Sequence, residues 1–213
     1  MFKDRMEAGK LLAERLMALK LDNPCLLAVP RGGIVIAQPI ASLLHSQIHV
    51  LVTRKIGHPL NSEVAIGVVM SDGSAILDSQ VVAGIGIGKH ELNNMISEEY
   101  KEVQRRQILY TGSAEPPPIK DKTAIIIDDG IATGYTIRGA IQWLKQEQPC
   151  KIMIAIPVAP PDIVKELAKE VDEVICLIQP EPFWAVGMHY EEFPQTTDKE
   201  VAEILHLSQF CHN

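Results

Sequence analysis

Short apolar runs alternate along this 213-residue chain with segments whose apolar residues recur at helical spacing. Such alternation favours a mostly parallel sheet with helices on both faces. The runs that we expect to form strands are 25–29, 48–53, 123–127, 152–158 and 173–178. The segments that we expect to form helices are 4–20, 34–44, 137–146, 161–170 and 198–207, with Asp4 and Asp198 as N-caps. The sequence therefore predicts an α/β protein with an open sheet flanked by helices.

Residues 57–118 interrupt this order. Two β-like runs, 63–70 and 74–77, are joined by Ser71-Asp72-Gly73, which is a hairpin signal. A long polar helix is predicted over 89–110. We interpret 57–118 as a β-hairpin flap or insertion in a single domain that spans 1–207, followed by a short tail at 208–213.

Composition restricts the partners and the location. A formal net charge of −7 argues against a nucleic-acid partner. Apolar stretches such as 34–44 are too short to cross a membrane, and the first residues lack a signal-peptide pattern. The four cysteines form no CxxC pair, which argues against a zinc site and is typical of a reducing compartment. These features predict a cytoplasmic protein.

The most informative stretch is the apolar run 124–127, which ends in two adjacent carboxylates, Asp128 and Asp129. A loop rich in small and hydroxyl residues leads from there into the next helix; it consists of Gly130, Ile131, Ala132, Thr133, Gly134, Tyr135 and Thr136. Ligands of open α/β sheets bind at the carboxyl ends of strands, and a helix N-terminus attracts phosphate. Paired carboxylates can accept hydrogen bonds from a sugar diol. The alternative is that the two acids only cap the helix.

This stretch resembles the signature of the type I phosphoribosyltransferases. The resemblance implies transfer of the 5-phosphoribosyl group from 5-phosphoribosyl-1-pyrophosphate (PRPP) to a nitrogenous base, with release of pyrophosphate. It assigns Asp128 and Asp129 to the ribose hydroxyls and 130–136 to the 5′-phosphate. It also implies Mg²⁺, held through the ligand and water and by Asp128 and Asp129, and a homodimer. Relatives that act on hypoxanthine and guanine carry an Asp where Ala132 stands.

A second loop, Val29-Pro30-Arg31-Gly32-Gly33, follows the first predicted strand. In the family such a loop binds pyrophosphate, often through a cis peptide, which here is the Pro30–Arg31 bond. Arg54 and Lys55 follow the second predicted strand and are assigned by the resemblance to pyrophosphate as well. Asp128, Asp129, Arg31 and Lys55 are thus the predicted catalytic set. Taken alone, either loop is also compatible with an ordinary turn or a solvated basic pair.

A segment rich in prolines and aromatic residues follows the last predicted strand, and we call residues 178–195 the hood. In purine phosphoribosyltransferases such a segment covers the base, which implies that Phe183, Trp184 and Ala185 bind it. An aromatic cluster is equally compatible with plain core. Glu63 in the flap, and Glu191 and Glu192 in the hood, are further candidates.

The similarity extends over about 1–207 and is closest to a bacterial group without an assigned substrate, through 54–57, 128–134 and 180–183. The alternative function is a non-catalytic PRPP or nucleotide sensor that keeps the fold and lacks turnover. The identity of the base and the pathway stay open.

Overall fold

A five-stranded parallel sheet forms the centre of the computed structural model, which describes residues 1–59, 61–113 and 117–210. The strand order is β2-β1-β6-β7-β8. The strands are β1 (Pro24–Ala28), β2 (Ile48–Val50), β6 (Thr123–Ile127), β7 (Lys151–Val158) and β8 (Glu173–Ile178). The predicted α/β class and parallel sheet are confirmed.

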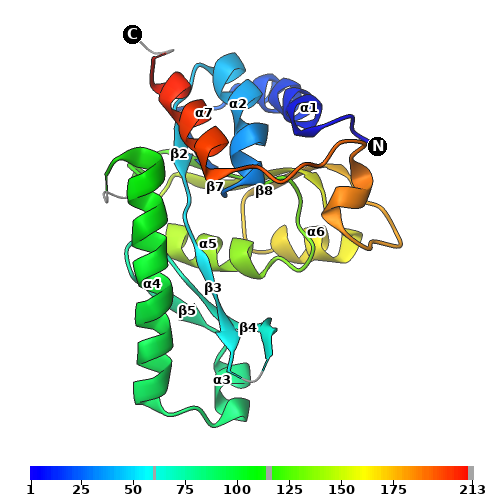
Figure 1. Cartoon of the computed structure of the whole chain (residues 1–213). Helices are drawn as coiled ribbons and strands as arrows, with labels where there is room; N and C mark the ends of the chain where they lie inside the picture. Colours follow the sequence, from blue (N-terminus) through cyan, green and yellow to red (C-terminus); the bar gives the residue numbers. More distant parts are fainter. Residues whose placement is uncertain (60, 114–116, 211–213) are drawn as a thin grey trace.

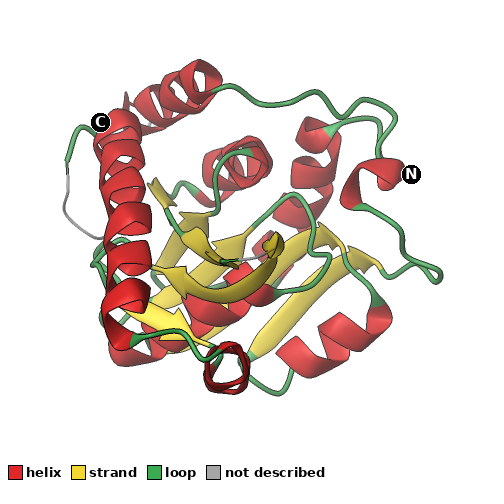
Figure 2. Ribbon diagram, turned by 60° about the horizontal axis from the view of Figure 1, so that its bottom comes forward, coloured by secondary structure: helices red, strands yellow, loops and turns green. Residues whose placement is uncertain are grey.

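Helices cover both faces of this sheet (Figures 1 and 2). One layer contains α1 (Arg5–Ala18), α2 (Gly32–Leu44) and α7 (Asp198–Phe210), and the other contains α5 (Tyr135–Gln146) and α6 (Pro161–Leu167). Because side chains alternate along a strand, Ile125 and Ile127 join the core under the first layer, whereas Ala124 and Ile126 join the core under the second. Strands buried on both faces explain why these runs are apolar throughout.

A second, three-stranded antiparallel sheet is built from β3 (Arg54–His58), β4 (Asn61–Val69) and β5 (Ala75–Leu77). The hairpin between β4 and β5 agrees with the prediction. Strand β3 was not expected, because two charges and a glycine leave this run with little apolar signal. Only its pairing with β4 makes it a strand. The predicted strand over 48–53 accordingly ends at Val50, and the tail at 208–210 belongs to α7.

The hairpin packs firmly against α5. Val68 and Met70 are buried in the same core cluster as the α5 side chains Ile141 and Trp143. The indole Nε1–H of Trp143 donates a hydrogen bond of 3.0 Å to Asp72 Oδ2 in the turn that joins β4 and β5. The base of the predicted flap is thus part of the core. The side chain of Glu63 lies outside the described residues.

Two more helices, α3 (Ser79–Ile85) and α4 (Lys89–Thr111), follow the hairpin, and α4 runs along one side of the molecule (Figure 1). Asp4 caps α1 as predicted, accepting from the amide of Glu7 at 2.8 Å. The predicted cap Asp198 is instead the first residue of α7. Thr197 precedes it, and its Oγ1 accepts from the amide of Glu200. Within the described ranges, no helix combines the length and the hydropathy needed to cross a membrane.

Candidate functional site

The loops after β1 and β6 lie side by side because these strands are adjacent and parallel. Ala28 is the register partner of Ile127, so both strands end at the same edge of the sheet. The amide of Val29 donates to the carbonyl of Ile127 at 2.8 Å. Each loop then enters a helix, α2 or α5, whose N-terminus is at that edge. The Pro30–Arg31 peptide is cis, as the resemblance implied.

The first loop passes directly beneath the second. A Cβ atom on Gly32 would lie 1.9 Å from Asp129 Oδ2, and one on Gly33 would lie 2.6 Å from the carbonyl oxygen of Ile127. Neither distance is possible for a real side chain. The paired glycines are therefore required by the close approach of the two loops.

Asp128 and Asp129 are both half-buried at this edge. The amide of Asp129 donates to Asp128 Oδ1 at 2.8 Å, and Arg5 Nε–H donates to Asp129 Oδ2 at 2.7 Å. Burial, followed by the negative charge of Asp129, raises the pKa of Asp128 well above its ordinary value. Burial also raises the pKa of Asp129, and the adjacent Arg5 opposes that rise. Since one acid would suffice as a helix cap, this crowding of charge is unfavourable unless a ligand uses it.

The loop from Gly130 to Thr136 divides into an anchored part and an open part. Ile131 is buried, and its amide donates to the carbonyl of Val158 at 2.9 Å. Because the amide of Ile131 already has this acceptor, it is not available to a phosphate, although the resemblance included it in the phosphate loop. Ala132, Thr133 and Tyr135 are exposed.

The N-terminus of α5 is open. Gly134 occupies the N-cap position, and no side chain caps the helix there. The first internal helix bond runs from the amide of Arg138 to the carbonyl of Gly134. The four amides of residues 134–137 therefore lack helical acceptors, as at any helix start. They lie at the helix start that follows the strand end with the two acids, and they carry the positive end of the helix dipole.

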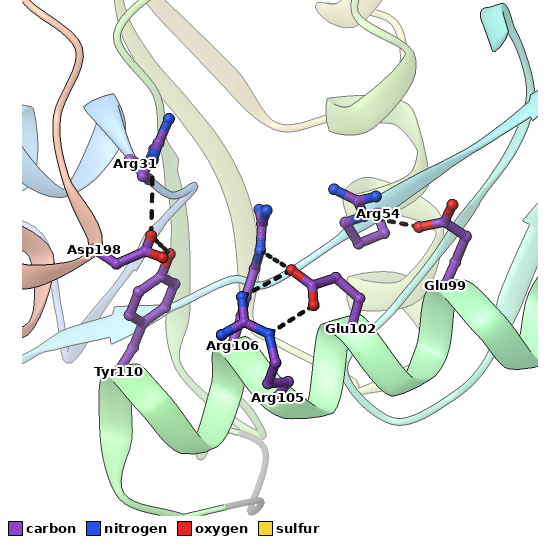
Figure 3. A network of polar contacts seen from close by, with 8 residues as sticks. All are labelled: Arg31, Arg54, Glu99, Glu102, Arg105, Arg106, Tyr110 and Asp198. Carbon is purple, nitrogen blue, oxygen red and sulfur yellow. Dashed lines mark hydrogen bonds and ion pairs between the residues drawn. The ribbon is translucent and has the colours of Figure 1, made fainter.

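Of the predicted basic residues, only Arg31 lies in the loop after β1. Its Nη1 is 3.9 Å from Asp198 Oδ1, which also accepts from the hydroxyl of Tyr110 at 2.6 Å (Figure 3). Arg54 and Lys55 belong to β3, in the second sheet, rather than to a loop at a strand end. Arg54 Nε–H donates to Glu99 Oε2 on α4 at 2.8 Å (Figure 3).

A cavity of about 1110 Å³ separates the open loop from the hood. Ala132 and Thr133 line one side, α6 lines another, and Phe183 and Trp184 line the hood side. Trp184 is 77% exposed, whereas Phe183 stacks on His189 at a centroid distance of 5.4 Å. Ala185 is exposed and is not among the described residues that line the cavity. The structure thus brings Trp184 and the open loop to one cavity, and it assigns Phe183 partly to packing.

Two residues at the acids escaped the sequence analysis, Arg5 and Tyr190. Besides its bond to Asp129, Arg5 donates from Nη1 to the carbonyl of Pro194 at 2.7 Å. The hydroxyl of Tyr190 donates to the carbonyl of Asp129 at 2.6 Å. An arginine 124 positions away from its partner carries no motif, so the sequence offered no signal for it.

The acids do not form a metal cage by themselves. Among the residues that the structure describes, no group of three or more His, Cys, Asp or Glu side chains could hold a metal ion. A divalent ion at this edge would therefore need ligand oxygens in addition to the two aspartates.

Known proteins are similar to this chain in sequence and in fold. The chain is 38% identical over 205 residues, 96% of its length, to a protein of Mycobacterium tuberculosis whose name assigns it provisionally as a phosphoribosyl transferase. The chain spans 46% of the length of that relative. It is also 26% identical over 113 residues to the uracil phosphoribosyltransferase of Mycoplasma genitalium, spanning 52% of that protein.

Among solved structures, TT1426 of Thermus thermophilus is 34% identical and has a TM-score of 0.83, with 96% of this chain and 97% of that chain covered. AQ2163 of Aquifex aeolicus, 14% identical with a TM-score of 0.52, shares the fold. The model of the phosphoribosyl transferase domain matches residues 3–192. The chain therefore belongs to the phosphoribosyl transferase domain family.

Proposed function

We propose that this protein transfers the 5-phosphoribosyl group of PRPP to a nitrogenous base and releases pyrophosphate. One observation carries the proposal: two adjacent carboxylates and an uncapped helix N-terminus occupy a single loop, directly above a second loop that starts another helix. The carboxylates suit a sugar diol, and the helix start suits a phosphate. A phosphorylated pentose carries both a diol and a phosphate, so it can use both features of this loop.

In this proposal Asp128 and Asp129 accept hydrogen bonds from the ribose hydroxyls. The amides at the start of α5 and the hydroxyls of Thr133 and Thr136 bind the 5′-phosphate. Arg31 and the amides at the start of α2, which also lacks a side-chain cap, bind the pyrophosphate. Lys55, on β3, is a further proposed contact of the pyrophosphate.

The reaction breaks the bond between C1 of the ribose and the pyrophosphate oxygen, which keeps the electron pair. A lone pair on a nitrogen of the base forms the new bond to C1. Because positive charge develops on the sugar and negative charge on the leaving group, the protein has to align the reactants and neutralise pyrophosphate. Arg31 and the two helix N-termini suit that task. No covalent nucleophile from the chain is needed.

Mg²⁺ fits the donor chemistry of this edge. The ion prefers oxygen ligands and is commonly held by one or two carboxylates together with substrate phosphates. Asp128 and Asp129 would hold it together with oxygens of PRPP. When bound, it supplies positive charge that stabilises the leaving pyrophosphate.

The acids provide the direct test. In the double variant Asp128→Asn with Asp129→Asn, PRPP affinity should fall about 100-fold or more, since hydrogen bonds to charged groups contribute roughly 1.5–3 kcal/mol each. Isothermal calorimetry with Mg²⁺ measures the affinity, and circular dichroism verifies the fold. Glu203→Gln, an exposed carboxylate on α7, is the matched control and should bind normally. Unchanged affinity in the double variant would refute the assignment.

Turnover needs its own measurement. Protein, Mg²⁺ and PRPP are incubated with a panel of purines and pyrimidines, and pyrophosphate release is followed. Release that depends on one base supports the transferase and names its acceptor. PRPP binding without release under any base would instead support the non-catalytic sensor, which keeps the same site.

Trp184 tests the base side of the cavity. Trp184→Ala should raise the concentration of base required for turnover far more than that of PRPP. The chain has two tryptophans, and Trp143 is fully buried, so quenching by iodide reports on Trp184. The accepted base should protect Trp184 from quenching in the wild type. Equal effects on base and PRPP would remove Trp184 from the base site.

A further inference from the structure

We propose that Arg5 is a positioning residue for the sugar-binding acids: it holds one carboxylate oxygen of Asp129 and connects that oxygen to the hood. The inference rests on the proposed function, since it assumes that Asp129 meets a ribose hydroxyl. Its subject is a residue on the N-terminal helix, outside both predicted ligand loops.

The guanidinium of Arg5 is fixed by three contacts from two separate parts of the chain, the loop after β6 and the hood. Its Nε–H donates to Asp129 Oδ2 at 2.7 Å, and its Nη1 donates to the carbonyl of Pro194 at 2.7 Å. Its Cζ lies 3.7 Å from the centroid of the Phe193 ring. The side chain is only 10% exposed. Two charge-assisted bonds and a ring contact leave this group a single orientation.

Holding Asp129 in this way has a direct consequence for a ligand. Arg5 occupies Oδ2, so the carboxylate presents Oδ1 to a hydroxyl. The positive charge also offsets the repulsion between two adjacent half-buried carboxylates. Without Arg5, Asp129 would be free to rotate and would carry an uncompensated charge in a poorly solvated place.

The loop after β1 also restricts the positions of Asp129 and Arg5. A Cβ atom on Gly32 would lie 1.9 Å from Asp129 Oδ2 and 2.8 Å from Arg5 Nε. The ion pair therefore rests directly on the loop that we assign to pyrophosphate. One contact thus joins α1, the two ligand loops and the hood.

The hood holds Asp129 from its other end. Tyr190 donates from its hydroxyl to the carbonyl of Asp129 at 2.6 Å, and its ring lies 4.9 Å from that of Phe193. Arg5 and Tyr190 thus reach the same aspartate, one at the side chain and one at the backbone. The orientation of the sugar-binding acid is coupled to the segment that covers the base.

The alternative is that Arg5 only fastens α1 to the rest of the molecule. The chain offers a matched control for this, because the neighbouring Asp4 caps the same helix without touching the site. Asp4→Ala should destabilise the start of α1 and leave PRPP affinity as in the wild type. Arg5→Met keeps much of the apolar side chain and removes both bonds and the charge.

The test compares affinities for PRPP with Mg²⁺ and for inorganic pyrophosphate, by calorimetry. Arg5→Met should weaken PRPP binding about 10- to 100-fold, as is typical for groups that orient a ligand-binding side chain. Pyrophosphate affinity should change less than about twofold, since pyrophosphate makes no use of the sugar acids. Arg5→Lys, which keeps the charge, should recover part of the PRPP affinity. If Arg5→Met does not fold, Arg5→Lys alone should still show the selective loss for PRPP.

A double-variant cycle separates positioning from independent effects. If Arg5 acts through Asp129, Arg5→Met should weaken PRPP binding in the wild type and add almost nothing in an Asp129→Asn background. Additive losses, equal losses for both ligands, or wild-type PRPP affinity in Arg5→Met would overturn the inference. So would a loss in Asp4→Ala equal to that in Arg5→Met. Failure of the wild type itself to bind PRPP would refute the proposed function instead.

Discussion

The loops after β1 and β6 look alike in the sequence, since each connects a buried strand to a helix through glycines. The structure separates them. In the first loop, Gly32 and Gly33 are required because the second loop lies directly on them. In the second, Gly134 has a φ of +76°, and the nearest atom to a Cβ there would be 3.5 Å away. One loop needs glycine for space and the other for backbone conformation.

This difference indicates how the site is divided. The first loop, residues 29–33, packs tightly against the second and fixes the position of the two acids; we call it the floor. The second loop, residues 128–136, packs on the floor at its beginning, and at its end it leaves the first amides of α5 without a side-chain cap. A rigid support beneath an open loop is an arrangement that positions a ligand without a large rearrangement. Three substitutions would break or sharpen this comparison.

The largest effect is expected in the floor. Gly33→Ala would place a Cβ atom 2.6 Å from the carbonyl oxygen of Ile127 and 3.0 Å from Asp128 Cα. Both are backbone atoms, so relief requires the strand end to move. We expect a loss of more than about 3 kcal/mol in the free energy of unfolding, measured by urea denaturation. A stability close to that of the wild type would show that the loops are not in tight contact.

A smaller effect is expected in the open loop. Gly134→Ala has room for its methyl group, so its cost comes from the left-handed backbone alone, about 1–2 kcal/mol. The same urea experiment should therefore rank Gly33→Ala well below Gly134→Ala in stability. The reverse order would contradict the division into floor and open loop.

The third substitution, Asp128→Asn, is expected to change the stability least, and it should stabilise the protein. The folded protein raises the pKa of Asp128 above 3.8, so the folded state binds its proton more tightly than the unfolded state does. The stability that this contributes is full at pH below 3.8 and is lost as the pH rises through the raised pKa. Asp128→Asn should therefore stabilise the ligand-free protein at pH 7, by roughly 2–4 °C in Tm if the gain is about 1 kcal/mol.

The pH dependence provides the control for that variant. In metal-free buffer, the difference in Tm between Asp128→Asn and the wild type should shrink as the pH is lowered toward 4, because the wild-type carboxyl then becomes neutral. A gain in Tm that is equally large at pH 4 and pH 7 would show that the charge is not the cause. A lower Tm at pH 7 would show that Asp128 is stabilising as it stands.

The core elements were predictable because their signals are local. The apolar runs at 123–127 and 173–178 became strands with the predicted bounds, since burial on both faces of a parallel sheet requires continuous apolar sequence. Asp128 and Asp129 lie at a strand end for the same reason. Strand β3 was missed because it depends on pairing with β4 across the chain. The cap of α7 is Thr197 rather than Asp198, because the hydroxyl of Thr197 accepts from the amide of Glu200.

The sequence alone determined the sheet, the edge at which its strands end, and the two acids with the loop that follows them, because each depends on residues adjacent in the chain. The tertiary structure alone decided which groups surround those acids. Arg5, Tyr190 and Gly32 reach Asp129 from distant parts of the chain, and Asp198 from α7 reaches Arg31. Contacts of this kind depend on how helices and loops pack in three dimensions, and no local pattern of residues encodes them.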